Sequence, residues 1–339
     1  MNSGSVYVIA EIGVNHNGSV EIAKRLIDDI AASGCDAVKF QLFKTEDIVT
    51  RRAEKAAYQI ENTANNESQY DMLKRLELSE EAFFGLKQYC DERKVDFLAT
   101  PFDKSSVDVL ERLDVPAYKI GSGDLTNMPL LVRVARTGKP MIVSTGMADL
   151  EEVAEALSWI GGIGPVPVTL LHCTSSYPTA YGEVNMKAMQ ALSNHFNCDV
   201  GYSDHTVGLE IPIMAVAMGA KVIEKHVTLD RSMAGPDHRA SLETKDLSTL
   251  VSMIRHVESA FGCSEKRMCE SERETAIAAR KSIVSNRKLK KGEVIEEKDI
   301  SIKRPGTGLA PKRYDWLLGR VVAKDVDSDT PLQERDVEV

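Results

Sequence analysis

The sequence lacks any long apolar run, any excess of positive charge and any wealth of aromatic residues. No stretch approaches the roughly 20 consecutive apolar residues of a membrane-spanning helix, and the apolar run Val6–Ile12 lies too near the start to be the core of a signal peptide. The 42 lysines and arginines are outnumbered by 51 aspartates and glutamates, and the formal net charge is −9. This balance argues against nucleic acid or an anionic membrane as a partner. We therefore expect a cytoplasmic protein.

The cysteines lack a pattern as well. No pair has the spacing of a CxxC motif, although the chain contains six: Cys35, Cys90, Cys173, Cys198, Cys263 and Cys269. Scattered cysteines in a chain without a secretory signal are expected to stay reduced. The sequence predicts free, mostly buried thiols and no cysteine metal site.

What the sequence does contain is a repeated alternation of strand-like and helix-like segments. Hydrophobic residues make up 43% and charged residues 27% of the chain, which is the composition of a globular protein with a sizeable core. Amphipathic segments such as Val20–Ala32 separate eight strand-like runs: Tyr7–Ile12, Ala37–Gln41, Asp96–Thr100, Ala117–Gly121, Pro140–Thr145, Val168–Cys173, Cys198–Asp204 and Lys221–Val227. This alternation predicts an α/β fold, a (β/α)8 TIM barrel over residues 1–262, with its site at the carboxyl ends of the strands.

The pattern changes after the barrel. Residues 263–281 are highly charged and helical in pattern, so we interpret them as a semi-rigid linker. Residues 282–339 contain short β-rich runs and turns, which indicate a small second domain. Because it contains few large apolar side chains, we expect it to depend on the barrel or on another subunit for stability.

Polar residues gather at the predicted carboxyl ends of the strands. Lys39 and Lys119 sit within strands on the inward face, where a desolvated ammonium group requires an anion. Glu11 shares a face with Ile9 and can also point inward. Hydroxyls and glycine-rich turns surround these positions, which suits a phosphate or carboxylate ligand. Two simpler interpretations stay open: the lysines reach solvent, or Glu11 is a structural carboxylate paired with one of them.

Two histidines end neighbouring strands. Period-two geometry places His205 and His226 at the carboxyl ends of a strand–helix–strand unit, and the Gly-Pro loop that follows carries Asp237. Two neutral imidazoles and a carboxylate, with positions left for water or substrate, form a candidate open site for a divalent metal. A pair of core histidines satisfied by neighbours is an equally good interpretation. His16 is expected to stabilise its turn, and His172 to be a satisfied barrel histidine.

Between the second and third strands lies a polar insertion, residues 46–79, that is too long for an ordinary loop. We interpret it as a lid over the mouth of the barrel.

The motifs at the strand ends together resemble a known family. They are Glu11–Gly18, Val38–Gln41, Thr100–Asp103, Tyr118–Asp124, Ser144–Met147, Ser203–His205, Glu224–His226, Gly235–Asp237 and Lys303–Gly306. In this order they are similar to the bacterial sialic acid synthases, and the similarity extends to a C-terminal antifreeze-like (SAF) domain. That family condenses phosphoenolpyruvate with an open-chain N-acetylated hexosamine, forms a nine-carbon sugar acid and releases phosphate.

The resemblance implies a role for each matching residue. His205 and His226 would bind a divalent metal, usually Mn²⁺, with Mg²⁺ or Co²⁺ as alternatives, and Glu11 and Asp237 would act on water beside it. The phosphoenolpyruvate site would comprise Lys39, Gln41, Thr100, Lys119, Ser122, Ser144 and Ser203. The sugar site would comprise Asp47, Asp124, Ser175, Tyr177 and, from the partner in a homodimer with exchanged C-terminal domains, Arg304. Several relatives have Glu in place of Asp124 and Asn in place of Ser175, so the identity of the sugar is open.

The sequence thus favours an N-acetylneuraminate synthase that uses N-acetylmannosamine. The first alternative is a legionaminate or pseudaminate synthase that uses a 2,4-diacetamido-2,4,6-trideoxyhexose. Another phosphoenolpyruvate-dependent or metal-dependent aldolase on the same barrel is a second alternative. A non-enzymatic sugar-binding or ice-binding protein is a third, suggested only by the tail.

Overall fold

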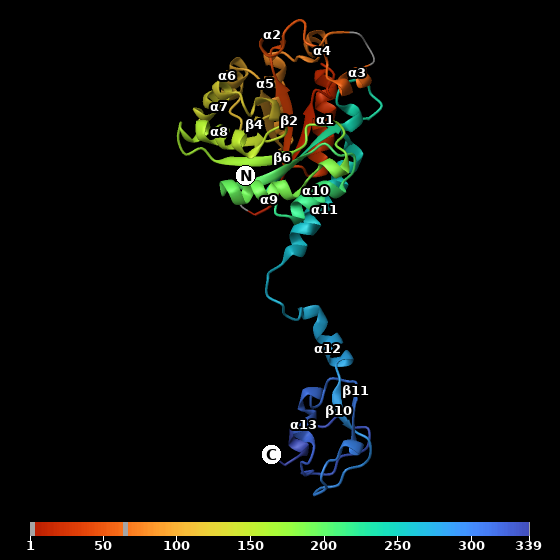
Figure 1. Cartoon of the computed structure of the whole chain (residues 1–339). Helices are drawn as coiled ribbons and strands as arrows, with labels where there is room; N and C mark the ends of the chain where they lie inside the picture. Colours follow the sequence, from red (N-terminus) through yellow and green to blue (C-terminus); the bar gives the residue numbers. More distant parts are fainter. Residues whose placement is uncertain (1–3, 64–66, 339) are drawn as a thin grey trace. The chain divides into compact units, whose positions relative to one another are not determined.

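The computed structural model describes residues 4–63 and 67–338, which fall into two compact units that divide between Gly262 and Cys263. In the first unit parallel strands alternate with helices (Figure 1). The strands are β1 (Tyr7–Gly13), β2 (Ala37–Leu42), β3 (Asp96–Pro101), β4 (Tyr118–Ile120), β5 (Met141–Ser144), β6 (Val168–Cys173), β7 (Asp199–Asp204) and β8 (Val222–Thr228).

Helices cover the outside of these strands. They are α1 (Val20–Ser33), α5 (Glu80–Glu92), α6 (Lys104–Arg112), α7 (Met128–Ala135), α8 (Leu150–Gly161), α9 (Lys187–Phe196), α10 (Glu210–Ala217) and α11 (Thr244–Phe261). The sequence explains α1 well: the Ser19 hydroxyl caps its first turn, and Gly34 ends it with a φ of 83° that glycine adopts at low cost. Its buried residues recur every three or four positions, so one face packs on the sheet.

The strands close into the predicted barrel. Their hydrogen-bonded order is β3-β2-β1-β8-β7-β6-β5-β4, all parallel, and a short strand β9 (Leu242–Glu243) pairs with β8. The two end strands, β3 and β4, lie side by side with Cα atoms within 8 Å of each other. The sheet therefore curls back on itself, as in a TIM barrel.

The inside of the barrel is divided into an apolar and a polar layer. The apolar layer consists of Tyr7, Ile9, Ala37, Leu98, Ala117, Ile142, Leu171 and Val222. Two residues further along the strands, and thus on the same inward face, come polar side chains such as Lys39, Thr100 and Lys119. The polar layer lies at the carboxyl ends of the strands. The site is thereby restricted to that end, because the apolar layer fills the barrel below it.

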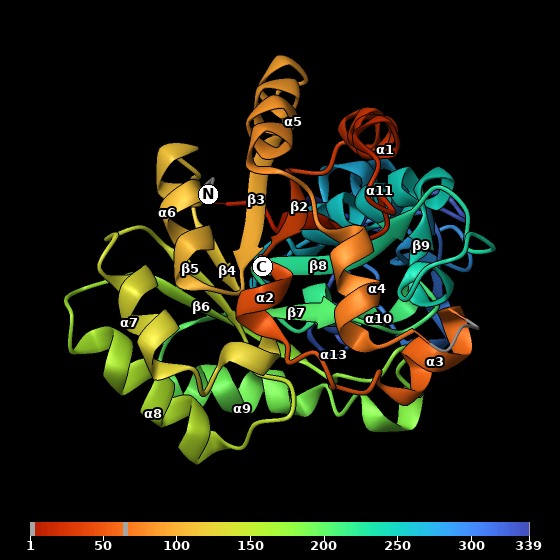
Figure 2. The same cartoon turned by 90° about the horizontal axis from the view of Figure 1, so that it is seen from above.

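The insertion after β2 forms three short helices over this end of the barrel: α2 (Thr45–Ile48), α3 (Ala57–Thr63) and α4 (Gln69–Leu76) (Figure 2). Met72 and Leu76 of α4 pack on Val14 and Phe43. The Asn62 amide donates a hydrogen bond of 2.6 Å to the Pro236 carbonyl, in the loop that carries Asp237. The insertion therefore contacts the rim of the site, in agreement with its interpretation as a lid.

The second unit begins with irregular residues 263–269, followed by a short helix, α12 (Arg273–Ala279). Antiparallel strands β10 (Ser282–Ser285) and β11 (Ile300–Lys303) and a short helix, α13 (Tyr314–Leu317), come next. This unit has a hydrophobic core of its own: Ile283, Leu289, Ile295, Ile300, Leu309, Leu317, Val322, Val326, Leu332 and Val337. All of these residues are isoleucine, leucine or valine, and together they bury a continuous apolar surface.

Two predictions from composition can be checked against the described residues. None of the helices among them is long and apolar enough to cross a membrane. All six cysteines are free thiols, and Cys35, Cys90 and Cys173 are buried, whereas Cys263 and Cys269 are exposed. The expectation that the thiols are mostly buried therefore holds for the barrel and is wrong for the start of the second unit.

Candidate active site

Two buried lysines stand in the polar layer, as the strand pattern predicts. Lys39 of β2 and Lys119 of β4 are only 3% and 2% exposed. The Lys39 ammonium donates to the Thr100 hydroxyl at 3.0 Å, and the Lys119 ammonium donates to the Ser144 hydroxyl at 2.6 Å. These contacts join strands β2 with β3 and β4 with β5. Both ammonium groups are thus held at fixed positions inside the barrel.

A buried glutamate joins the two lysines. The Glu224 carboxylate of β8 lies 3.6 Å from the ammonium groups of both Lys39 and Lys119, and it accepts a hydrogen bond of 3.0 Å from Ser203. Burial alone would raise the pKa of Glu224, but the two lysines outweigh this effect and lower the pKa to about 2. Burial lowers the pKa of Lys119 in turn. Glu224 is therefore a fixed negative charge at the centre of the site.

Glu11 of β1 forms the second buried ion pair. Its carboxylate lies 2.8 Å from the Lys39 ammonium and accepts a hydrogen bond of 3.2 Å from Gln41. Gly13 leaves room for this arrangement: its φ is 55°, and a Cβ there would lie 3.1 Å from Glu11 Oε1 and 3.2 Å from Gln41 Nε2. The interpretation of Glu11 as a carboxylate paired with a lysine therefore describes this geometry. A catalytic role for Glu11 requires that the pair separate.

Burial and charge act on this pair in opposite directions. Burial raises the pKa of the Glu11 carboxyl group. Lys39 acts in the opposite direction without cancelling this effect, and the nearby Glu224 carboxylate adds to the increase. Burial also disfavours the charged form of Lys39, but Glu11 and Glu224 outweigh it and raise the pKa of that ammonium group. An anion that reached Lys39 would compete with Glu11 for the same cation.

Small side chains form a cradle beside Lys119. Gly146 follows β5 and donates its backbone N–H to the Ser122 hydroxyl at 3.0 Å. A Cβ at Gly146 would lie 2.4 Å from Ser175 Oγ, 2.8 Å from Ser122 Oγ and 2.9 Å from Cys173 Sγ, so only glycine fits there. Hydroxyls and backbone N–H groups packed this closely beside a buried cation are suited to a phosphate group.

The two predicted histidines converge on the mouth of the barrel. The rings of His205 and His226 have centroids 5.5 Å apart, and the Tyr177 ring contacts His205 at a tilt of 40°, with centroids 4.2 Å apart. His205 Nδ1 lies 2.7 Å from the Thr174 carbonyl, a partner that requires Nδ1–H and leaves Nε2 with a free lone pair. Burial lowers the pKa of His205, and it lowers that of His226 further because His205 is close by. Both rings are therefore neutral, the form that binds a metal.

These histidines fit a metal site in chemistry but supply only part of it. His226 Nδ1 is buried and has no hydrogen-bond partner within residues 4–63 and 67–338. Its nearest carboxylate oxygen is that of Asp237, at 4.0 Å, and burial raises the pKa of Asp237 to about 7, with Glu11 adding to the shift. Across the described part of the chain, no three His, Cys, Asp or Glu side chains converge tightly enough to hold an ion by themselves. His205 and His226 would thus contribute two ligands, and other positions would be left to water or substrate.

The predicted sugar-binding residues are more dispersed. Tyr177 and Ser175 lie at the mouth after β6, and Asp124 is half-buried and accepts a hydrogen bond of 2.9 Å from Asn127. Burial raises the pKa of Asp124. Asp47 is exposed on α2, and Arg304 is exposed after β11 in the second unit. Within the barrel, the structure therefore brings Tyr177 to the histidines and Ser175 to the Gly146 cradle, while Asp47 lies outside the buried polar layer.

The remaining histidines and one carboxylate complete the comparison with the sequence pattern. His16 Nδ1 accepts the Gly18 backbone N–H at 3.0 Å, as expected for a turn-stabilising residue, and His172 Nε2 lies 2.7 Å from the Val184 carbonyl. Glu224 was not among the predicted site residues. The sequence feature that could have identified it is its position two residues before His226, because this spacing puts both side chains on one face of β8.

A small cavity of about 110 Å³ lies over His226. Its walls combine residues of the barrel, the lid and the loop after β8: Val14, Gln41, Gln59, Met72, Leu73, Tyr177, His226, Pro236 and Asp237. The lid therefore closes over the histidine end of the site, and the two lysines lie deeper.

Comparison with known proteins agrees with this geometry. Residues 26–266 match the NeuB family and residues 280–338 match the SAF domain. The chain is 46% identical over 329 residues to the N,N'-diacetyllegionaminic acid synthase of Campylobacter jejuni, covering 96% of this chain and 98% of that one. It is 43% identical over 341 residues to the Legionella pneumophila synthase of the same name, with coverage of 99% and 96%.

A solved structure matches as well. The N-acetylneuraminic acid (sialic acid) synthetase of Leptospira borgpetersenii serovar Hardjo-bovis has a TM-score of 0.71 and 34% sequence identity, covering 80% of this chain and 90% of that one. The chain belongs to the NeuB family.

Proposed function

We propose that this protein condenses phosphoenolpyruvate with a 2,4-diacetamido-2,4,6-trideoxyhexose and water, yielding a legionaminate-type nonulosonic acid and phosphate. The observation that carries the reaction is the pair of buried lysines, Lys39 and Lys119, beside the Gly146 cradle in an acidic protein. A small, highly charged anion suits such a site. The chain is a carbon–carbon bond-forming enzyme of the phosphoenolpyruvate-dependent NeuB type.

The choice of sugar rests on the comparisons. The sequence alone favoured N-acetylmannosamine and N-acetylneuraminate. The two legionaminic acid synthases, at 46% and 43% identity, are more similar to the chain than the sialic acid synthetase at 34%. This difference supports the diacetamido sugar.

The lysines would hold phosphoenolpyruvate through its two charged groups. Lys119, Ser144 and the Gly146 cradle are suited to the phosphate, and Lys39 with Thr100 to the carboxylate, because each set combines a cation with hydroxyl donors. These groups are positioned before the ligand arrives by their contacts with each other and with Glu224. Their role is to orient the anion and to stabilise its charge.

Binding of the anion would also free a base. Glu11 and the substrate carboxylate compete for Lys39, so occupation of the lysine by substrate weakens the Glu11 pair. The released Glu11 carboxylate stays in place because Gln41 donates a hydrogen bond to it. It can then accept a proton from the water that attacks C2 of the substrate. Asp237 is the second candidate for this role, since its pKa of about 7 lets it exchange a proton near neutral pH.

His205 and His226 would hold a divalent metal, for which Mn²⁺ is our first choice and Mg²⁺ or Co²⁺ the alternatives. When bound there, such an ion polarises an aldehyde oxygen as a Lewis acid. The protein contributes two neutral imidazoles, one of them fixed in its tautomer by Thr174. Tyr177 packs on His205 and limits the room for solvent.

The proposed function can be tested with a mixture of sugars. The purified protein should release phosphate from phosphoenolpyruvate only in the presence of an acceptor. With equal amounts of N-acetylmannosamine and 2,4-diacetamido-2,4,6-trideoxymannose, mass spectrometry should show mainly the diacetylated nine-carbon acid. Exclusive formation of N-acetylneuraminate would assign the enzyme to the other sugar, and no phosphate release with any acceptor would reject the reaction.

We further propose a homodimer in which the C-terminal domain of each chain completes its partner's site. Arg304 supports this arrangement because its exposed guanidinium follows strand β11 in a Lys-Arg-Pro-Gly segment. Polar sugar groups suit such a cation.

Subunit exchange tests the dimer. Arg304→Ala and His226→Ala homodimers should each be impaired, but a mixture of them should regain activity. If the arginine acts in trans, a mixed dimer has one site with both defects and one with neither. If it acts in cis, each site keeps one defect and activity stays low. Mass photometry on the mixture should be used to verify that mixed dimers form.

A further inference from the structure

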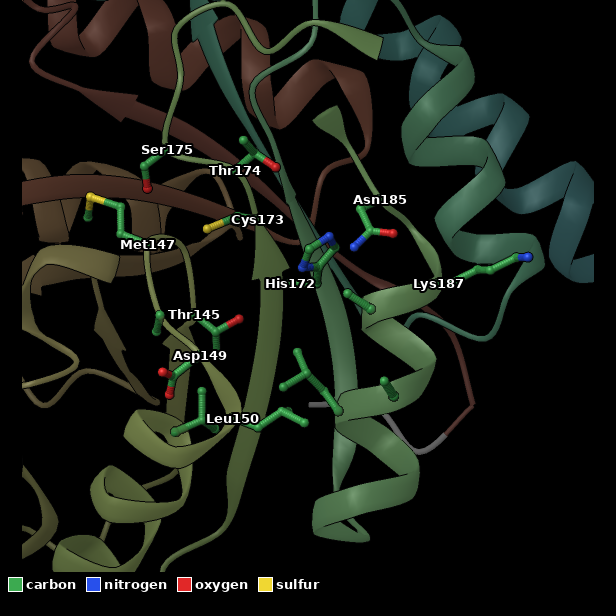
Figure 3. A pocket seen from close by; sticks show the side chains of 15 residues that line it. Thr145, Met147, Asp149, Leu150, His172, Cys173, Thr174, Ser175, Asn185 and Lys187 are labelled. Atoms are coloured by element: carbon green, nitrogen blue, oxygen red, sulfur yellow. The ribbon is translucent and has the colours of Figure 1, made fainter. Parts of the chain in front are cut away.

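A large pocket lies beside the cradle, between helices α8 and α9. It has a volume of about 780 Å³ and is lined by residues of the segments 145–153, 172–175 and 185–192. Figure 3 shows Ser175 and Met147 on one side of it, Asn185 and Lys187 on the other, and His172 between them. We call it the α8–α9 pocket. Most of the residues that line it have no role in the active site described above.

The α8–α9 pocket borders the Gly146 cradle of the active site. Ser175 and Cys173 line it, and the same two side chains lie against Gly146, where a Cβ would be 2.4 Å from Ser175 Oγ and 2.9 Å from Cys173 Sγ. The cradle and the pocket thus share a wall of small side chains. A substrate that reacts at the histidines and extends past Ser175 would enter the pocket.

Most of the side chains that line the pocket are apolar or already make hydrogen bonds within the protein. Leu150 and Val153 of α8 face Ala188, Ala191 and Leu192 of α9 across the pocket. Polar residues offer few free groups: Thr145 Oγ1 donates to the Leu171 carbonyl at 3.0 Å and Thr174 Oγ1 to the Glu183 carbonyl at 3.1 Å. Methyl groups therefore bind this floor better than hydroxyls do.

Free polar groups stand at one end of the α8–α9 pocket. The Asn185 amide and the Lys187 ammonium are exposed there, and neither makes a hydrogen bond or ion pair with other described residues. The Asp149 carboxylate on the opposite side accepts backbone N–H groups of α8 at 2.9 Å. One lysine facing a carboxylate is a weak site for a phosphate, but an amide and an ammonium group suit an acetyl carbonyl.

We propose that the α8–α9 pocket binds the far end of the acceptor sugar, with its second acetamido group and its terminal methyl group, and thereby selects diacetamido-trideoxy sugars. This inference rests on the proposed function and assigns its sugar specificity to residues of α8 and α9. The methyl groups lie on the floor formed by Leu150, Val153 and Ala188, and the acetyl oxygen lies at the Asn185 end. N-acetylmannosamine has no second acetamido group and no terminal methyl group to place on this floor, so it gains nothing from the pocket and binds less well.

A pocket-filling substitution tests the proposal. Ala188→Phe puts a ring into the α8–α9 pocket from a half-buried position on α9. Gln190→Phe is the matched control, because Gln190 is exposed on the same helix and does not line the pocket. For both variants and the wild type, kcat/KM should be measured with the diacetamido-trideoxy sugar, N-acetylmannosamine and N-acetylmannosamine 6-phosphate. The KM for phosphoenolpyruvate and a thermal melt serve as checks of an intact site and fold.

Ala188→Phe should lower kcat/KM for the diacetamido sugar by about 10- to 100-fold, as expected for crowding of an apolar pocket by one side chain. The value for N-acetylmannosamine should change less than about threefold, since that sugar has no second acetamido group to place there. Gln190→Phe should leave both values unchanged. Lys187→Ala should weaken use of the diacetamido sugar only slightly, because an exposed lysine contributes little to binding a neutral group.

The outcomes separate the two proposals. If the wild type prefers the diacetamido sugar but Ala188→Phe reduces the use of all acceptors equally, the pocket does not select the sugar and the present inference is wrong. If the 6-phosphate is the best acceptor and Lys187→Ala abolishes that preference, the pocket binds a phosphate instead. If the wild type prefers N-acetylmannosamine, the proposed function itself fails, and the specificity assigned to the pocket fails with it.

Discussion

Lys119→Ala should lower kcat/KM for phosphoenolpyruvate by about 10²- to 10³-fold. The ammonium group is buried, donates to Ser144 at 2.6 Å and lies 3.6 Å from Glu224. Loss of one preorganised electrostatic donor costs about 10²- to 10³-fold in rate, or roughly 2.7–4 kcal/mol, since each 1.36 kcal/mol lost from the transition state is a factor of ten. Steady-state kinetics with varied phosphoenolpyruvate measure the effect, and the KM for the sugar should change much less.

A second lysine provides the matched control. Lys221→Ala makes the same change of charge just before β8, at the amino end of the strands, where the side chain is exposed. Because that end lies away from the polar layer, phosphoenolpyruvate kinetics should be unchanged. A similar loss in both variants would mean that net charge, and not a contact at the site, controls the reaction.

Glu224 allows the loss of binding to be distinguished from a loss of stability. In Lys119→Ala the Glu224 carboxylate is buried with one cation fewer, so the melting temperature should fall. Adding Glu224→Gln removes the buried charge and should recover part of the stability. Activity should stay low, because the ammonium group that faces the anion is still missing. If activity returned together with stability, Lys119 would be a structural residue only.

The sequence predicted the barrel well because burial imposes a simple pattern on its strands. Inward positions must alternate with outward ones, and the inward set changes from apolar to polar along each strand, as Ile9 and Glu11 show on β1. Both lysines and both histidines could be placed on this basis. Strand limits differ by a residue or so from the prediction, as at β4, which is one residue shorter at each end than expected.

The ion pairs could not be predicted in the same way. Period-two geometry says that Glu11, Lys39 and Glu224 all face inward, but not which carboxylate meets which ammonium group. That choice depends on the register between β1, β2 and β8, which pairs Glu11 with both Lys39 and His226. The sequence pattern therefore placed Glu224 on one face with His226 but assigned it no role in the site.

The core of the second unit and the α8–α9 pocket could not be predicted from the sequence for a different reason. From its composition, the tail was expected to contain few large apolar side chains. In the structure, ten isoleucine, leucine and valine side chains are buried together there. Their contacts come from turns and isolated bridges such as Leu289 with Val326, which have no sequence period. The pocket likewise depends on how far apart two consecutive helices stand, and this spacing is set by loops.

His226→Ala should abolish turnover and leave the barrel folded, and treatment of the wild type with a chelator should have the same effect. His226 and His205 are buried, neutral imidazoles with centroids 5.5 Å apart, and His226 Nδ1 has no hydrogen-bond partner among the described residues. A buried polar nitrogen without a partner is costly unless a ligand satisfies it. Metal content per chain should therefore fall in the variant, as measured by elemental analysis on protein loaded with Mn²⁺, and Mn²⁺ should restore turnover of the chelated wild type.

His195→Ala is the control, since His195 is an exposed histidine on α9 and its loss should change neither metal content nor rate. A thermal melt distinguishes loss of the metal from loss of the fold. If the chelated wild type retained full turnover with no metal detected, the two histidines would serve another purpose, and their lone pairs would have to be explained by a substrate donor. If His226→Ala bound as much Mn²⁺ as the wild type, the site would lie elsewhere. We expect neither result, because the Thr174 carbonyl leaves a free lone pair on His205 Nε2 and no protein donor satisfies Nδ1 of His226 in the described part of the chain.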